Sequence, residues 1–482
     1  HQVLRVQGSE RAVNVVNSDC IKAEAVDLGG KLGGLTLNQQ IISLAVWPLL
    51  QNVLSVLVGF ADRVIAGHVS PEGDLTAVID MMGLLMYMGW LMMIMQGAVA
   101  TGAQALVSRA YGAGDYQLAE RAVGQSVFLG FVTGSIAGLV LWLLAPLLAG
   151  FFGLNEVATD YFLEFIQILV FSAPMSGVVF VLSACLRGAG DTWTPFNAMV
   201  VVNIVNAICS YSFAMYFGMG MAGIALGTVV GWAFGLAMLF WKIYPRETKQ
   251  SLLVLRRKWM HFQRDICLRI VRVGVPQLIE ILGMWSVHAY GLRMIALIGD
   301  NDDGLIGSHG LAVQIESISF MPGFAIGTAA ATLAGQYLGA GSKEMAEKAV
   351  RTCWRVALVV MSFMGLAIFL SADLLVQVMS PGGGAQADMA VSLVMIVAFA
   401  QPFFATAMVM KMSMRGAGAT GIVMFYSFAT MLLFRVGLLT LLVNHYGADL
   451  QMIWYIFTLD IVIQASVFIW VHYRGKWMDK EV

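Results

Sequence analysis

Long apolar runs, separated by short polar segments, follow one another along the chain from about residue 42 to residue 473. Each run holds about 20 residues or more, and a helix of that length is long enough to cross the hydrocarbon core of a bilayer. We therefore predict twelve transmembrane helices, near residues 42–69, 78–108, 122–150, 161–186, 195–217, 220–243, 268–298, 305–337, 348–377, 388–414, 420–446 and 450–473.

The loop lysines and arginines gather on one side of these predicted helices. If both termini share a side, the loops on that side lie near 109–121, 187–194, 244–267, 338–347 and 415–419, and each contains or adjoins basic residues. The loops on the other side, such as "FFGLNEVATD" and "GDNDDGL", contain none. Because basic loops are retained on the cytoplasmic side, the pattern predicts that both termini are cytoplasmic.

The composition is typical of a membrane protein. Of 482 residues, 59% are hydrophobic and 12% charged, with a mean hydropathy of +0.79, whereas soluble proteins carry about 25% charged residues. A net charge of -1 predicts no nucleic-acid partner. The five scattered cysteines are interpreted as reduced, apolar residues. We find no P-loop of the G-x-x-x-x-G-K-[ST] type, no nucleophile–base set and no metal site, so we predict neither an enzyme nor a cofactor.

The second half of the chain repeats the first at an offset of 227 or 228 positions. "GAGDYQLAERAV" (112–123) recurs as "GAGSKEMAEKAV" (339–350), and "LRGAG" (186–190) recurs as "MRGAG" (414–418). Since each unit has six spans, both units have the same orientation. The predicted fold is an all-α membrane protein with two six-helix lobes related by a pseudo-two-fold axis along the membrane normal. A substrate would lie between lobes that rock to expose it to alternate sides.

This organisation predicts five segments: a cytoplasmic tail (1–41), the N-lobe (42–243), a linker (244–267), the C-lobe (268–473) and a second tail (474–482). The linker is basic and amphipathic, which favours a helix lying on the anionic inner leaflet. We interpret "RGAG" and "GAG" as tight turns at cytoplasmic helix ends, where glycine adopts left-handed dihedrals. Their arginine and acidic neighbours are predicted to cap helices and to anchor at the headgroups.

Several motifs resemble those of the multidrug and toxic compound extrusion (MATE) family. They are "GFADRVIAG" in the first helix, "LRGAGDTWTP" after the fourth, "GVPQLIE" in the seventh and "FMPGFAIGTAAATLAGQYLGAG" in the eighth. The resemblance runs from about residue 40 to residue 470. It implies a cell-membrane antiporter that uses inward H+ or Na+ to expel bulky, often cationic, organic compounds. The expected partners are such compounds and membrane lipids, and we expect a monomer.

Two other transporter classes were weighed against this resemblance. A flippase of the same broader superfamily, acting on lipid-linked precursors, would need a strongly basic cavity, and few arginines lie deep in the predicted spans. A major facilitator transporter would carry its Gly-x-x-x-Asp-Arg signature in a cytoplasmic loop, whereas the similar residues here lie inside the first helix.

The resemblance implies coupling residues in the N-lobe. Asp62 matches the first-helix aspartate that is linked to proton or cation binding in the family. In "VVNIVNAICSYSF", Asn203 or Asn206 matches the family's helix 5 asparagine, but the aspartate one turn away is absent, with Ser210 the nearest polar residue. A single aspartate suits a proton better than sodium. The alternative role for the asparagines is interhelical hydrogen bonding.

In the C-lobe, Glu280 matches a seventh-helix glutamate that serves a cation site in some branches of the family. Phe404 falls where those branches place an aspartate, and Glu316 is a candidate replacement. Arg435 and Asp460 lie at similar depth, about 15 Å from the outer ends of their helices, which predicts a structural ion pair.

Possible substrate contacts lie in the first two helices. The second, "MMGLLMYMGWLMMIMQG", is rich in methionine, which adapts to varied apolar ligands but also faces lipid. From it we name Met86, Tyr87 and Trp90, the last two as aromatic partners for a cation, and we add Gln51 from the first helix.

Overall fold

The computed structural model describes residues 28–69, 75–244, 252–298, 304–380, 383–480 and 482. Within these ranges every regular element is helical. The first half contains α1 (Leu37–Val69), α2 (Leu75–Gly112), α3 (Tyr116–Phe151), α4 (Glu156–Leu169), α5 (Ala173–Gly188), α6 (Trp193–Tyr211) and α7 (Gly220–Ile243). The second contains α8 (Arg264–Ile298), α9 (Leu305–Ser319), α10 (Met321–Gly339), α11 (Lys343–Leu370), α12 (Ala372–Met379), α13 (Ala385–Gly416), α14 (Thr420–Thr430), α15 (Leu439–Tyr446) and α16 (Leu450–Tyr473).

These helices confirm the predicted all-helical membrane fold. Ten helices in the described ranges are long and apolar enough to cross a membrane, and an eleventh span forms if α9 and α10, bent by 43°, count as one. Helix α8 is as long as the others but more polar, because Arg269, Arg272 and Glu280 lie along it. With α8 the helices follow the twelve predicted segments.

Several spans are interrupted where the sequence pattern is continuous. The fourth span breaks at a 3-10 turn, η2 (Val170–Ser172), and Pro174 follows in the first turn of α5, where a missing N–H costs no helical hydrogen bond. The eleventh passes through a π-helical stretch, η5 (Met431–Leu438), between α14 and α15. Such π-helical turns are frequent at functional sites.

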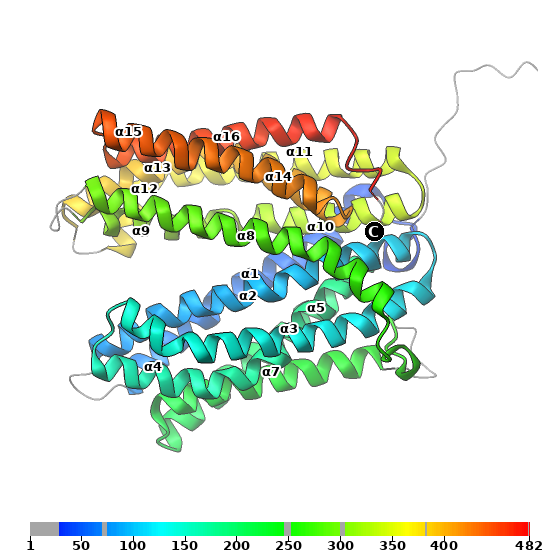
Figure 1. The fold of residues 1–482 in the computed structure, drawn as a ribbon, viewed down its shortest axis with the longest axis horizontal. Helices are drawn as coiled ribbons and strands as arrows, with labels where there is room; N and C mark the ends of the chain where they lie inside the picture. Colours follow the sequence, from blue (N-terminus) through cyan, green and yellow to red (C-terminus); the bar gives the residue numbers. More distant parts are fainter. Residues whose placement is uncertain (1–27, 70–74, 245–251, 299–303, 381–382, 481) are drawn as a thin grey trace, which may run out of the picture.

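The two lobes lie side by side, with α1–α7 below and α8–α16 above in Figure 1. Their ribbons converge at the end that carries the C terminus and the linker, here called the linker end, and diverge toward the other end (Figure 1). The lobes also interlock there. Ile41 and Leu44 at the start of α1 belong to the C-lobe core, while Ile266 and Ile270 at the start of α8 belong to the N-lobe core.

The closest approach of the lobes is formed by the last turns of α2 and α10, which we call the interlobe seam. A methyl group on Gly112 would lie 2.0 Å from the Gln336 carbonyl oxygen, and one on Gly339 would lie 2.1 Å from the Arg109 carbonyl oxygen. Gly112 and Gly339 are equivalent in the repeat. The seam is therefore nearly two-fold symmetric, and it forms only because both positions lack a side chain.

Small residues also bring helices together inside the N-lobe. Gly223, Gly227, Gly231 and Gly235 form a stripe along α7 that packs directly on the backbone and short side chains of α6. Without water to drive apolar association in a bilayer, this close packing is the main attraction between helices.

The predicted linker helix is wrong for the described residues 252–263, which contain only the 3-10 turn η4 (Arg257–Trp259). The reason is Gln125 of α3. Its amide nitrogen donates to the carbonyls of Trp259 and His261 at 2.9 and 2.8 Å, and its amide oxygen accepts from the Gln263 N–H at 2.9 Å. This side chain takes the place of helical hydrogen bonds.

The predicted first tail is packed from residue 28 onward, and residues 1–27 lie outside the described ranges. Leu28 and Leu32 are buried in the C-lobe core. Lys31 forms an ion pair of 2.8 Å with Asp191 of the N-lobe. In the second tail, Trp477 is fully buried and donates its indole N–H to the His472 carbonyl at 3.1 Å. Both segments thus lie against the lobes at the linker end.

We expect Gly112→Ala to destabilise the protein by about 1–3 kcal/mol, because the added methyl group overpacks the seam. Thermal unfolding in detergent micelles measures this. Gly310→Ala is the matched control, since a methyl group there meets no atom within 4 Å and a helical alanine is favoured over glycine. Equal melting temperatures for wild type and Gly112→Ala would contradict the packing described.

Candidate functional site

The C-lobe interior contains a carboxylate that accepts hydrogen bonds through only one of its two oxygens. Glu280 of α8 is 4% exposed and lies one turn after Pro276. Its Oε1 accepts hydrogen bonds from Arg415 Nη2 of α13 at 2.9 Å and from Ser427 Oγ of α14 at 2.8 Å. Its Oε2 is buried and has no hydrogen-bond partner among the described residues.

The position of Arg415 corrects one prediction. We expected the arginines of the "RGAG" turns to anchor at the headgroups, but Arg415 points inward and pairs with Glu280, with 20% and 6% of the two side chains exposed. Buried charges in a membrane protein are usually paired with each other. The acidic neighbours do cap helices: Asp115 accepts from the Leu118 N–H at 2.9 Å, and Asp191 accepts from the Thr194 N–H at 3.1 Å.

A second buried ion pair joins η5 to α16. Arg435 Nε lies 2.7 Å from Asp460 Oδ2, and the Asp460 side chain is fully buried. Gln464, one turn further along α16, donates to the same oxygen at 2.9 Å. The guanidinium of Arg435 also lies over the Phe457 ring, 4.8 Å from its centre. The structure therefore brings together the two residues that we predicted as an ion pair.

Lys411 of α13 lies between the two ion pairs and was missed by our sequence reading. Its ammonium donates to Gln464 Oε1 and faces the Phe468 ring at 5.1 Å. No ion pair of the described residues includes it, although it contributes to the field at Glu280. A lone lysine in the apolar run "MVMKMSM" was the available signal, because isolated charges in spans are costly and usually functional.

Glu316 lies on α9, one turn before the bend at Phe320, and in the field of Arg435. Its role as a replacement ligand beside Glu280 stays a prediction. Nearby, His309 is 4% exposed and contacts the rings of His288 and Trp454, with centres 6.0 and 5.3 Å away.

In the N-lobe, both predicted asparagines lie buried on α6. Asn206 donates from Nδ2 to Thr228 Oγ1 of α7 at 2.9 Å, which is an interhelical hydrogen bond. Asn203 is 7% exposed, and its Nδ2 has no hydrogen-bond partner among the described residues. Ser210 donates to the Ile224 carbonyl at 3.2 Å.

The remaining predicted residues lie on α1 and α2. Gln51 is half-buried on α1, and its carbonyl accepts a hydrogen bond from Ser55 Oγ at 3.0 Å. The side chains of Asp62, Met86, Tyr87 and Trp90 lie outside the described part of the structure. Their roles stay predictions.

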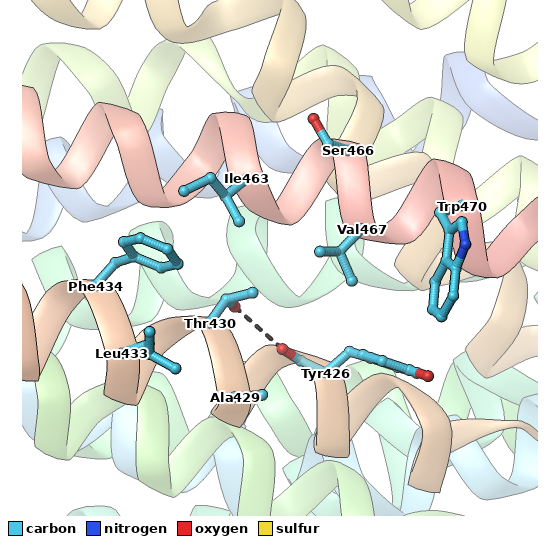
Figure 2. A pocket seen from close by; sticks show the side chains of 9 residues that line it. All are labelled: Tyr426, Ala429, Thr430, Leu433, Phe434, Ile463, Ser466, Val467 and Trp470. Atoms are coloured by element: carbon cyan, nitrogen blue, oxygen red, sulfur yellow. Dashed lines mark hydrogen bonds between the residues drawn. The ribbon is translucent and has the colours of Figure 1, made fainter.

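An apolar groove of about 430 Å³ runs between α14, η5 and α16 (Figure 2). Its lining includes Tyr426, Phe434 and Trp470, and the hydroxyl groups of Thr430 and Ser466 bind backbone carbonyls of their own helices. Thr430 donates to the Tyr426 carbonyl at 3.1 Å, as drawn in Figure 2, and Ser466 donates to the Val462 carbonyl at 2.9 Å. None of its lining residues is charged, so the groove offers no coupling chemistry.

Comparison with known proteins identifies the family. The MatE family model matches residues 49–212 and again residues 278–441, so that both halves of the repeat match. The chain belongs to the MatE family. Among curated relatives, the "Probable multidrug resistance protein NorM" of Thermotoga maritima is 28% identical over 452 residues, covering 92% of this chain and 94% of that protein. A protein of the same name from Pseudomonas aeruginosa is 29% identical, covering 77% and 75%.

Solved structures show the same fold. The bent form of the Vibrio cholerae MATE transporter VcmN matches with a TM-score of 0.81 at 18% identity, over 92% of this chain and 97% of that one. A MOP superfamily transporter from Pyrococcus furiosus matches with a TM-score of 0.82 at 19% identity, over 92% and 97%. This MatE protein is therefore a multi-pass membrane transporter with two lobes.

We expect Asp460→Leu and Arg435→Met each to destabilise the protein by about 3–5 kcal/mol, since each leaves an uncompensated buried charge. The double variant, with both charges removed, should be more stable than either single variant. Thermal unfolding of all four proteins measures the coupling. Asp479→Asn is the control, because its partner Lys343 and Asp479 itself are both exposed and screened by solvent. Additive losses in the double variant would exclude a coupled pair.

Proposed function

We propose that this MatE protein is an antiporter that exports organic compounds from the cytoplasm in exchange for inward protons. The lobes would expose a central binding region to one side of the membrane at a time. The names of the curated relatives, which refer to multidrug resistance, support the export of varied organic compounds. We infer the coupling ion and the residues that bind it from the contacts of charged side chains in the C-lobe.

The observation that carries the proposal is the free oxygen of Glu280. A buried carboxylate with Oε1 bound by Arg415 and Ser427 and with Oε2 unbonded can take up a proton without losing both of its present hydrogen bonds. Protonation removes a negative charge from a site with two nearby cations, Arg415 and Lys411. The electrostatic balance of the C-lobe interior therefore depends on whether this one proton is bound.

The same geometry favours protons over sodium ions. Sodium would need several oxygen ligands, and at Glu280 it would have to bind close to a guanidinium that lies 2.9 Å from the carboxylate. Asp460 is likewise occupied by Arg435 and Gln464. Repulsion between like charges in a medium of low dielectric constant opposes any added cation at either site, a proton included. A proton needs only one oxygen, and Glu280 Oε2 has no hydrogen-bond partner among the described residues, whereas sodium needs several oxygen ligands.

The direction of transport follows from the orientation that the basic loops predict. We place the linker end, with its lysines and arginines, in the cytoplasm. The interlobe seam then closes the cytoplasmic side, and the binding region communicates with the outside. An inward proton gains about 2.3 kcal/mol for each 100 mV of membrane potential, before any pH gradient is added.

The substrate class is proposed to be amphipathic organic compounds, many of them cationic. Gln51, Met86, Tyr87 and Trp90 are the proposed contacts on α1 and α2. Asp62 is the proposed coupling acid of the N-lobe, and Asn203 and Asn206 are further candidates for coupling there. A flippase for lipid-linked precursors is less favoured. Of the three C-lobe cations named, Arg415 and Arg435 are already neutralised by Glu280 and Asp460, which leaves Lys411 alone to hold a pyrophosphate.

We expect Glu280→Gln to slow proton-driven transport by about 5- to 150-fold, the usual range of coupling between two sites. The assay is uptake of a fluorescent organic cation into liposomes that contain purified protein, with a pH gradient, a sodium gradient or neither. Asp62→Asn tests the N-lobe in the same way. Glu344→Gln is the control, because this acid is exposed at the linker end.

Wild type should respond to the pH gradient and not to the sodium gradient. A response to sodium alone would refute proton coupling. If wild type moves no organic cation under any gradient but binds a lipid-linked sugar, the flippase replaces the exporter.

A further inference from the structure

The interlobe seam is held by two hydrogen bonds whose donors are equivalent in the internal repeat and whose acceptors lie one position apart in the two "RGAG" turns. Arg109 Nη2 of α2 donates to the Ala417 carbonyl of the C-lobe "RGAG" turn at 2.9 Å. Gln336 Nε2 of α10 donates to the Gly188 carbonyl of the N-lobe "RGAG" turn at 2.8 Å. Arg109 and Gln336 occupy equivalent positions, three residues before Gly112 and Gly339. Each lobe thus binds the turn of the other.

The C-lobe turn is also tied to α8, the helix that carries Glu280. On one side of the turn, Arg415 pairs with Glu280 at 2.9 Å. On the other side, Thr420 Oγ1 donates to the Val273 carbonyl at 2.7 Å. The turn itself is closed by a hydrogen bond of 2.9 Å from the Gly418 N–H to the Arg415 carbonyl. Arg415 therefore belongs both to the buried ion pair and to the turn that receives Arg109.

The N-lobe turn lacks this link. By the repeat, Arg187 corresponds to Arg415, and Asn52 corresponds to Glu280. The ion pairs of the described residues include none with Arg187. Its turn is held by Thr192 Oγ1, which donates to the Ser43 carbonyl at 2.9 Å, much as Thr420 does in the C-lobe. In the N-lobe turn the ion-paired acid is Asp191, which binds Lys31, so among the described residues an acid pairs with the turn's own arginine only in the C-lobe.

We propose that Arg415 is the positioning residue that transmits the charge of Glu280 to the interlobe seam. This inference rests on the proposed proton coupling at Glu280. While Glu280 is ionised, it fixes the Arg415 guanidinium, and the turn presents the Ala417 carbonyl to Arg109. When Glu280 binds a proton, Arg415 and Lys411 lose their shared counter-charge and repel each other. The turn then shifts, the bond to Arg109 weakens, and the seam opens.

The groups that face Glu280 come from two helices and set this response. Arg415 and Lys411 project from α13, and Ser427 projects from α14. Through Gln464, Lys411 is linked to Asp460 and so to Arg435 on η5. Asp460 remains paired with Arg435, so it cannot replace Glu280 as the partner of Arg415. The order of events fits export: an outside proton opens the cytoplasmic side, where the substrate binds next.

The test measures seam opening directly. Spin labels on keto-bearing amino acids replace Gln117 and Glu344, which are exposed, equivalent positions in the first turns of α3 and α11 at the linker end. The native cysteines stay in place. Electron–electron distances are measured in nanodiscs from about pH 8 down to about pH 3.5, because Arg415 and Ser427 stabilise the ionised form of Glu280 and its protonation therefore needs acid conditions. Over this range we expect the open-to-closed ratio of wild type to rise by about 5- to 150-fold.

Arg415→Gln should abolish most of this pH response, and Glu280→Gln should fix the ratio at all pH values. Arg415→Lys, which keeps the charge but not the forked geometry, should restore part of the response. Arg187→Gln is the matched control and should respond as wild type does. Ser427→Ala removes the other hydrogen bond to Glu280 without touching the turn, and it should also keep a pH response. Only labelled variants with the melting temperature of a folded protein are compared.

A full pH response in Arg415→Gln overturns the proposal, as does an equal loss in Arg187→Gln, which would indicate a general effect of the turns. The failure of the proposed function looks different. If the seam responds to pH through Arg415 but no organic compound is moved in liposomes, the proposed role of Arg415 is supported and the proposed export function is refuted. If Arg415→Gln still transports under a pH gradient and its seam shows the wild-type pH response, export is supported and the proposed role of Arg415 is refuted.

Discussion

The contact between α2 and α10 at the linker end is the constraint on which the rest of the structure depends. Two glycines, Gly112 and Gly339, allow the backbones of opposite lobes to approach until carbonyl oxygens lie where side chains would otherwise be. Within a bilayer, close packing and hydrogen bonds must replace the hydrophobic effect as the attraction between helices. Because the contact is small and symmetric, it can separate and re-form as a unit, which is what lobes that alternate between two states require.

Around this contact the protein separates two kinds of buried polar group. Hydrogen bonds between uncharged groups, such as that of Asn206 with Thr228, fasten helices inside the N-lobe. Charged groups gather in the C-lobe, where two ion pairs and Lys411 lie between α8, α13, η5 and α16. Ionised groups are costly in a medium of low dielectric constant, so this group of charges makes the C-lobe interior sensitive to a single proton. Among the described side chains, the two halves of the repeat therefore differ in their buried ion pairs.

The asymmetry also gives the duplicated turns different roles. Both "RGAG" segments have the same left-handed glycine, with φ of 91° at Gly190 and 86° at Gly418, and both accept a hydrogen bond from the opposite lobe. Only the C-lobe turn has an acid within reach of its arginine. Duplication therefore provided two similar turns that differ in their charged partners. Glu280 stands where the first unit has Asn52, and Ala419 stands where the first turn has Asp191, which pairs with Lys31.

The sequence by itself determined the spans, the two-lobe repeat and the family, because apolar length and recurring motifs are local properties that survive without coordinates. It also indicated that Arg435 and Asp460 lie at one depth, since the helical rise converts position into height. Only the tertiary structure decided which residues pair with the buried charged side chains. Arg415 points inward and pairs with Glu280, Lys411 donates to Gln464, and Gln125 holds the segment where a linker helix was predicted. Such pairings depend on how helices rotate and cross, and a sequence read one helix at a time carries no information about those angles.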